Sequence, residues 1–169
     1  MHFVRYDRLD GIPHVIVDGQ ALPGSRLVLS HQPGAPTPRA LLADTSAEIV
    51  LNFLRLPDWR EQLAGVEAIS NDHFDLDGLL AAWALIAPDE ATARAARVAE
   101  AARAGDFNRY QEDFAAQLAC LTRGTAEWPA TPAGRSLAGL SGFARDAALY
   151  TDLLPLAGAM LDDIVRFDE

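Results

Sequence analysis

One segment, "VEAISNDHFDLDGLLAAWALIA" at residues 66–87, constrains the fold more than any other. It consists of a short apolar run, a polar loop and a long apolar run that stops at Pro88. A short apolar run fits a buried strand, whereas the later run has the length of a helix. This order is typical of an α/β domain, in which loops at the carboxyl ends of strands carry ligand sites. We therefore expect the polar loop to lie at the end of a strand.

The segments before this unit predict more strands and one helix. "FVRYD", "PHVIVDG" and "SRLVLSH" are short runs with β-branched residues, separated by turn signals such as Asp10-Gly11 and Pro23-Gly24. A proline-rich loop, "HQPGAPTPRA", follows and is too broken for a regular element. "ADTSAEIVLNFLRL" then predicts a helix capped by Asp44, Thr45 or Ser46, and "DWREQLAG" a helical turn.

The second half of the chain predicts helices. One spans 89–105 with Gly105 as its stop, and a second spans 106–124 with Asp106 as its cap. A third begins near Ser141 and is kinked at Pro155. The second helix is expected to bury one apolar face, formed by Phe107, Tyr110, Phe114, Leu118 and Leu121. The predicted fold is α/β: a small mixed or parallel sheet from the N-terminal half, packed with helices, and a mainly helical C-terminal half. We expect one domain over 1–169; the ending "DDIVRFDE" shows no terminating turn and also fits a piece of a longer protein.

Composition excludes several classes of function. The net charge of −10 and the pI of about 4.7 argue against general nucleic-acid binding, which needs clustered cations. All 14 basic residues are arginine, so neither a phosphate-loop lysine nor a Schiff-base lysine exists. The single cysteine, Cys120, permits no intramolecular disulfide and no cysteine zinc cluster. Neither a signal peptide nor a membrane span is apparent, so we expect a cytoplasmic protein that does not bind membranes.

The polar loop "NDHFDLDG" predicts a metal site. Asp72, His73, Asp75 and Asp77 lie within six positions, where their like charges repel unless a cation lies among them. Carboxylate oxygen and imidazole nitrogen suit Mn²⁺, and also Mg²⁺, Fe²⁺ or Zn²⁺. The alternative is structural: Asp77 caps the helix, Asp75 forms an Asx turn, and Asp72 and His73 are solvated.

"AISNDHFDLDGLLAAWAL" resembles the first motif of the DHH-type phosphoesterases, an apolar strand followed by a histidine or aspartate and D-x-D-G opening a helix. The resemblance covers about twenty residues. It implies manganese-dependent hydrolysis of a phosphodiester or pyrophosphate, with His73, Asp75 and Asp77 as ligands. The family's later Asp-His-His motif is absent, since His73 is the last histidine of the chain. Asp106 falls where the family carries an isolated middle aspartate, and a helix cap is its alternative role.

Three further comparisons arise from the same residues. "FDLDGLL" also resembles haloacid-dehalogenase-type phosphatases, with Asp75 as nucleophile, Asp77 as general acid and "LDD" at 161–163 as the late acidic motif. An EF-hand loop is excluded because Ala84 occupies the position of its glutamate. "LSHQPGAPTP", "ADTSAEI" and "NDHFDLDG" are together similar to an uncharacterised bacterial protein family without an assigned activity.

A second group of residues offers replacements for the missing histidines. His31 follows a predicted strand, and Asp44 lies at the next helix start. We expect His31 to fold against the acidic loop, with Asp44 as a further ligand; a loop histidine and a capping box are the alternatives. Arg39 or Arg109 is the expected phosphate contact.

Two classes of function follow. The first is a metal-dependent phosphoesterase-like hydrolase acting on a small phosphorylated substrate, with catalytic residues His31, His73, Asp75 and Asp77 and metal ligands Asp72, His73, Asp75, Asp77, Asp44 and Asp106. The second is a non-catalytic protein that keeps a degenerate site for metal or partner binding. The oligomeric state is not predicted by either.

Overall fold

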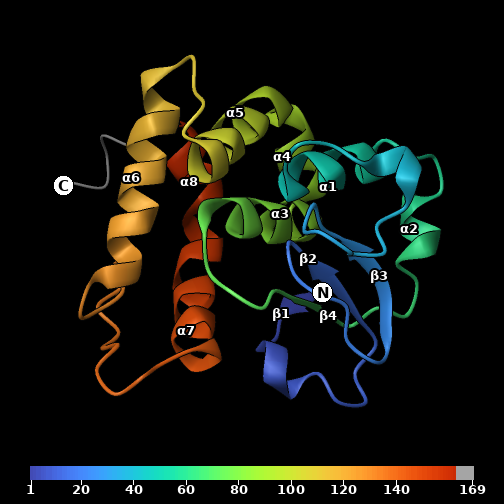
Figure 1. Ribbon diagram of the computed structural model, residues 1–169, viewed down its shortest axis with the longest axis horizontal. Helices are drawn as coiled ribbons and strands as arrows, with labels where there is room; N and C mark the ends of the chain where they lie inside the picture. The colour runs from blue at the N-terminus through green and yellow to red at the C-terminus, as the bar shows by residue number, and fades with distance from the viewer. Residues whose placement is uncertain (163–169) are drawn as a thin grey trace.

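The computed structural model describes residues 1–162 and confirms the α/β prediction (Figure 1). Four strands form one sheet in the order β1-β4-β2-β3, and all their pairings are parallel. The strands are β1 (His2–Phe3), β2 (His14–Val17), β3 (Ser25–Leu29) and β4 (Ala68–Ser70). Because the strands are parallel, their carboxyl ends lie along the same edge of the sheet. This edge positions the candidate site.

Two helices lie between β3 and β4 in the chain, and the helices after β4 make the C-terminal part of residues 1–162 mainly helical. The helices are α1 (Ser46–Leu54), α2 (Trp59–Gln62), α3 (Leu76–Ile86), α4 (Pro88–Ala93), α5 (Ala95–Phe107), α6 (Asp113–Glu127), α7 (Phe143–Leu153) and α8 (Ala157–Asp162). The chain bends between α7 and α8 at a 3₁₀ turn that contains Pro155, so the predicted kink is confirmed. Within residues 1–162, no helix combines the length and apolarity needed to cross a membrane.

The sheet is covered by helices on one face and by loops on the other. Val15 and Val17 of β2 point into the main core, whereas Ile16 between them joins a smaller cluster packed by the loops after β1 and β2. Helix α3 is central to the main core, since every residue from Leu76 to Leu85 is buried. It packs against α1 and α5, while α7 lies beside β1 (Figure 1). The acidic loop thus leads directly into the most buried helix of the described chain.

Several predicted elements differ from the structure. "FVRYD" is not a strand beyond Phe3, because Tyr6–Arg8 form a 3₁₀ turn. The helix predicted over 89–105 is two helices that meet at Arg94, whose backbone leaves helical geometry and whose side chain pairs with Asp162. Gly105 does not stop the second of these, since the helix continues to Phe107 and ends at Asn108 in the left-handed conformation (φ 52°).

The predicted helix over 106–124 begins later than its sequence indicates. Asp106 lies in the last turn of α5, and α6 begins at Asp113, after the extended residue Glu112. Phe107 and Tyr110 are consequently exposed and not part of a buried face, whereas Leu118 is buried as expected. Gly105 instead packs closely against Leu76, whose Cβ would lie 3.0 Å from a Cβ added to the glycine. Asp163, part of the predicted late acidic motif, lies outside the described residues.

Candidate metal centre

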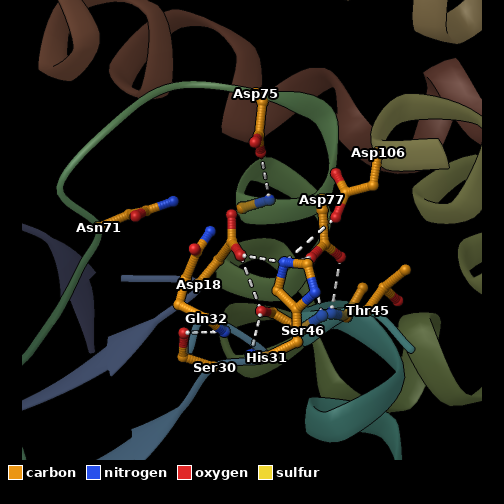
Figure 2. Close-up of polar contacts among 12 residues, drawn as sticks. Asp18, Ser30, His31, Gln32, Thr45, Ser46, Asn71, Asp75, Asp77 and Asp106 are labelled. Atoms are coloured by element: carbon orange, nitrogen blue, oxygen red, sulfur yellow. Dashed lines mark hydrogen bonds and ion pairs between the residues drawn. The ribbon is translucent and has the colours of Figure 1, made fainter. Parts of the chain in front are cut away.

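The carboxyl ends of three neighbouring strands bring the candidate site together (Figure 2). Asp18 directly follows β2, His31 lies just beyond β3, and the acidic loop follows β4. Helices α1, α3 and α5 contribute Ser46, Asp77 and Asp106 from the side that covers the sheet. This is the crevice at strand ends where open α/β sheets bind ligands.

Asp18 is the centre of the cluster and is fully buried. Its Oδ1 lies 3.2 Å from His31 Nε2 and accepts a hydrogen bond from Ser46 Oγ at 2.8 Å. Its Oδ2 lies 3.2 Å from His73 Nε2, but the hydrogen bond of that nitrogen goes to Asp75 Oδ2 at 2.9 Å. Oδ2 is therefore a buried oxygen without a hydrogen-bond partner among residues 1–162. Each oxygen of one carboxylate thus faces a different histidine.

Asp77 is oriented by the amino terminus of α1. The backbone N–H of Ser46 donates to Asp77 Oδ2 at 2.7 Å, and the N–H of Ala47 donates to Oδ1 at 2.8 Å (Figure 2). Two backbone donors favour the ionised carboxylate, and each oxygen retains a further lone pair. Oδ2 also lies 3.8 Å from His31 Nε2. Helix α1 therefore fixes Asp77 toward His31 without using up its capacity to bind a cation.

The acidic loop is held by hydrogen bonds on both sides. Asp72 Oδ2 accepts from the backbone N–H of Gln20, and Asp72 Oδ1 lies 2.7 Å from His73 Nδ1. Asp75 caps α3, with Oδ1 accepting from the N–H of Gly78 at 2.8 Å. Asp72 thus orients the ring of His73 and leaves Nε2 directed at Asp18 and Asp75, an arrangement common behind metal-binding histidines.

Asp106 reaches the cluster from α5. Its Oδ2 lies 3.2 Å from His31 Nε2, on the side of the imidazole opposite to the sheet (Figure 2). The ring of the next residue, Phe107, meets the ring of His31 edge-on at 6.2 Å between centres. His31 is therefore surrounded by carboxylates from three different elements.

The charges of the cluster are unbalanced without an added cation. Five carboxylates, those of Asp18, Asp72, Asp75, Asp77 and Asp106, surround two imidazoles. Hydrogen bonding to Asp18, together with the neighbouring negative charges, raises the pKa of His31 to about 9. The neighbouring carboxylates of Asp18, Asp72 and Asp75 raise the pKa of His73 to about 12. In the metal-free protein both imidazoles therefore carry positive charge at neutral pH, and five ionised carboxylates would exceed that charge by three.

Burial and the neighbouring imidazoles shift the pKa values of the carboxylates in opposite directions. Burial raises the pKa of Asp18, but the neighbouring imidazoles of His31 and His73 outweigh it and hold the pKa below its usual value. Burial and the charges of Asp18 and Asp106 raise the pKa of Asp77. Burial, with the charges of Asp75 and Asp18, raises the pKa of Asp106 to about 6. A cation in the cluster would relieve this repulsion.

Two groups of side chains can hold a metal ion, and they share Asp18. Asp18, His31 and Asp77 form the first, and Asp18, His73 and Asp75 form the second. Within each group the potential ligand atoms lie within 4.8 Å of one another. The donors are carboxylate oxygen and imidazole nitrogen, which fit Mn²⁺, Fe²⁺ or Zn²⁺ and, with fewer imidazoles, Mg²⁺. Asp18 Oδ2, which faces His73 and accepts no hydrogen bond within residues 1–162, has a lone pair that could bind a cation.

The structure places the other predicted residues around or away from this centre. Asp72 belongs to neither ligand group and supports His73, while Asp106 lies against His31. Asp44 is exposed and lines a separate cavity of about 820 Å³ together with Arg109. Arg39 is exposed in a 3₁₀ turn. Asp162 pairs with Arg94, so the described part of the "LDD" motif lies outside the cluster.

Asp18 was missed from the sequence because "VDG" after an apolar run is also an ordinary turn. Its backbone has a φ of 51°, a left-handed conformation that is uncommon outside glycine. The sequence contains a weaker signal, since Asp18 follows an apolar strand just as Asp72 and His31 do. Ser46 was expected only to cap α1, whereas Thr45 is the cap and Ser46 bonds Asp18.

Comparison with known proteins gives one match. No curated protein and no solved structure matches the chain. The model of a family described as a family of unknown function, DUF6687, matches residues 1–169. This agrees with the similarity to an uncharacterised family, while the resemblance of the acidic loop to DHH-type phosphoesterases stays a prediction from the motif. The chain belongs to the DUF6687 family.

Proposed function

We propose that this protein is a hydrolase of phosphate esters that uses two divalent metal ions. The observation that carries the proposal is the position of Asp18 between two ligand groups, with one oxygen toward His31 and the other toward His73. A carboxylate placed in this way can bridge two cations. Paired metal ions about 4 Å apart are the common arrangement in phosphatases and nucleases. The excess of carboxylates over imidazoles supplies the charge that two divalent ions need.

The protein's residues have distinct tasks in this proposal. Bound ions would supply Lewis acidity to a phosphoryl oxygen and a nucleophile from water at neutral pH. His31 and Asp77 would hold one ion, His73 and Asp75 would hold the other, and Asp18 belongs to both groups. Asp72 keeps the imidazole of His73 in the required orientation.

Asp106 is the proposed proton carrier. Its carboxyl lies beside His31 and outside both ligand groups, and its pKa of about 6 suits proton transfer near neutral pH. It can take a proton from the attacking water or give one to the leaving alcohol.

Arg109 is the proposed contact for the substrate's phosphate. Its guanidinium carbon lies 5.9 Å from the ring centre of Phe107, whose ring in turn packs on His31. The side chain makes no ion pair with a residue of the described chain, so it is available to a phosphate oxygen. A phosphodiester or a small phosphorylated compound is the proposed substrate class.

Asp18→Asn provides the sharpest test. Asparagine has the same shape and tolerates the left-handed backbone of this position, so the variant removes charge without forcing a change of fold. Wild-type protein incubated with Mn²⁺ and desalted should carry two ions per chain and hydrolyse bis(4-nitrophenyl) phosphate. Asp18→Asn should lose at least one ion and the activity, whereas Asp89→Asn, an exposed matched control, should change neither.

Two results would overturn parts of the proposal. Equal metal content in wild type and Asp18→Asn would remove the metal centre altogether. Two bound ions without hydrolysis of a chromogenic phosphomonoester or phosphodiester would instead favour the non-catalytic, metal-binding protein.

A further inference from the structure

Tyr150 extends from α7 to the back of the candidate metal centre, although it lies far from the acidic loop in the sequence. Its ring is completely buried, stacked on Phe3 at 4.1 Å and meeting Phe74 edge-on at 5.3 Å between ring centres. Phe3 belongs to β1 and Phe74 to the acidic loop. The aromatic contacts therefore fix where the phenol oxygen lies.

The hydroxyl of Tyr150 accepts one hydrogen bond and has its own proton left over. Asn71 Nδ2 donates to it at 2.8 Å. The orientation of the Asn71 amide is determined by its other end, because Oδ1 accepts from the backbone N–H of Asp72 at 2.7 Å. Tyr150 donates no hydrogen bond to any residue in 1–162. A buried phenol proton normally has an acceptor.

Asp18 Oδ2, an acceptor without a hydrogen-bond donor, lies near Gly78, which is also close to the Tyr150 hydroxyl. A Cβ placed on Gly78 would lie 2.1 Å from Asn71 Nδ2, 2.5 Å from the Tyr150 hydroxyl and 3.2 Å from Asp18 Oδ2. Three buried polar groups thus meet around the Cα of Gly78, and the Asn71 amide and the Tyr150 hydroxyl occupy the space that a side chain would need. Asp18 Oδ2 is the same oxygen that lacks a hydrogen-bond partner.

We propose that Tyr150 is a positioning residue for the His73–Asp75 half of the centre: its O–H donates, directly or through one water molecule, to Asp18 Oδ2. This inference rests on the two-ion centre proposed above. The hydrogen bond fixes the oxygen that faces His73 and leaves the oxygen that faces His31 under the control of Ser46. Each half of the shared carboxylate then has its own hydroxyl donor, Ser46 on one side and Tyr150 on the other.

The test is a comparison of Mn²⁺ binding by wild type, Tyr150→Phe and the control Tyr110→Phe, followed by calorimetric titration. Tyr150→Phe keeps both ring contacts and removes only the hydroxyl, while Tyr110 is exposed. Loss of a supporting hydrogen bond behind metal ligands weakens binding by about 10- to 100-fold. In Tyr150→Phe we expect the affinity for one of the two ions to fall by this factor and the affinity for the other to change less than about threefold. Tyr110→Phe should bind both ions as wild type does.

A purely structural role of Tyr150 would give a different result. It would lower the melting temperature of the metal-free protein and weaken both ions equally, which would overturn the inference. Unchanged binding of both ions by Tyr150→Phe would overturn it as well, while the two-ion centre would stand. A wild-type protein that binds no Mn²⁺ would overturn both proposals. Binding of two ions without hydrolysis would remove only the proposed activity.

Discussion

Gly78→Ala tests whether the packing behind the centre is as tight as the structure indicates. Gly78 lies in the first turn of α3, where alanine is by itself the better helix former by about 1 kcal/mol. The added methyl group would lie 2.1 Å from Asn71 Nδ2 and 2.5 Å from the Tyr150 hydroxyl. Both groups are buried and neither is the free end of an exposed chain. One of them must move, and the hydrogen bond between them must lengthen or break.

The expected cost exceeds the gain in helix propensity. Overpacking of a buried site costs about 1–3 kcal/mol, and breaking a buried hydrogen bond about 1–3 kcal/mol more. We expect Gly78→Ala to lower the free energy of unfolding of the metal-free protein by about 2–4 kcal/mol. For a chain of this size that corresponds to a fall of roughly 5–15 °C in melting temperature. Metal binding should weaken too, because Asp18 Oδ2 lies 3.2 Å from the new methyl position.

Gly124→Ala is the matched control, measured by the same thermal and urea unfolding. Gly124 lies in α6, and its nearest neighbour to an added Cβ is Trp128 Nε1 at 3.9 Å, an ordinary contact. Alanine should stabilise the protein there by about 0.5–1 kcal/mol. The reasoning is refuted if Gly78→Ala is as stable as wild type, or if both variants are stabilised alike.

Two further predictions concern pH. Asp152 accepts hydrogen bonds from Arg135 and Thr131 and so joins α7 to the loop before it. We expect Asp152→Asn to lower the free energy of unfolding at pH 7 by only about 1–2 kcal/mol, because Arg135 is half exposed. Since the ion pair with Arg135 lowers the pKa of Asp152, its contribution is present above about pH 4 and is lost in acid, so urea unfolding curves of wild type and variant should converge as the pH falls. Metal binding should weaken in acid as well. His31, with a pKa of about 9, must release its proton to bind an ion, so the apparent Mn²⁺ affinity should rise by up to about tenfold per pH unit between pH 6 and 8. Calorimetry that gives a pH-independent affinity over this range would contradict the assignment of His31 as a ligand.

The acidic loop and its place in the fold were predictable from local pattern. A short apolar run, a polar loop and a long apolar helix allow few arrangements, and the loop indeed follows β4 and opens α3. Asp75 and Asp77 therefore lie where their spacing indicated. His31 was also placed at a strand end by its sequence context.

Long-range contacts explain what local pattern did not predict. Asp106 was expected to begin a helix, but α5 continues through it, and this continuation places its carboxylate beside His31. Asp44 was preferred as a ligand because it adjoins a helix start, yet the amides of that helix point at Asp77 and leave Asp44 exposed. Tyr150 has no local signal, since its hydroxyl meets Asn71 only through packing of α7 beside β1.

Asp18 carries two energetic costs that an ordinary turn residue would not keep. A left-handed backbone at a non-glycine residue costs roughly 1 kcal/mol, and glycine or asparagine would avoid most of it. A buried carboxylate oxygen without a partner costs about 1–3 kcal/mol more. Asn108, the other non-glycine residue with positive φ in residues 1–162, ends a helix at the surface and has no such oxygen. Because the conformation of Asp18 directs its two oxygens to two different histidines, the proposed pair of bound cations would offset both costs, and a neutral side chain of the same shape could not bind such a pair.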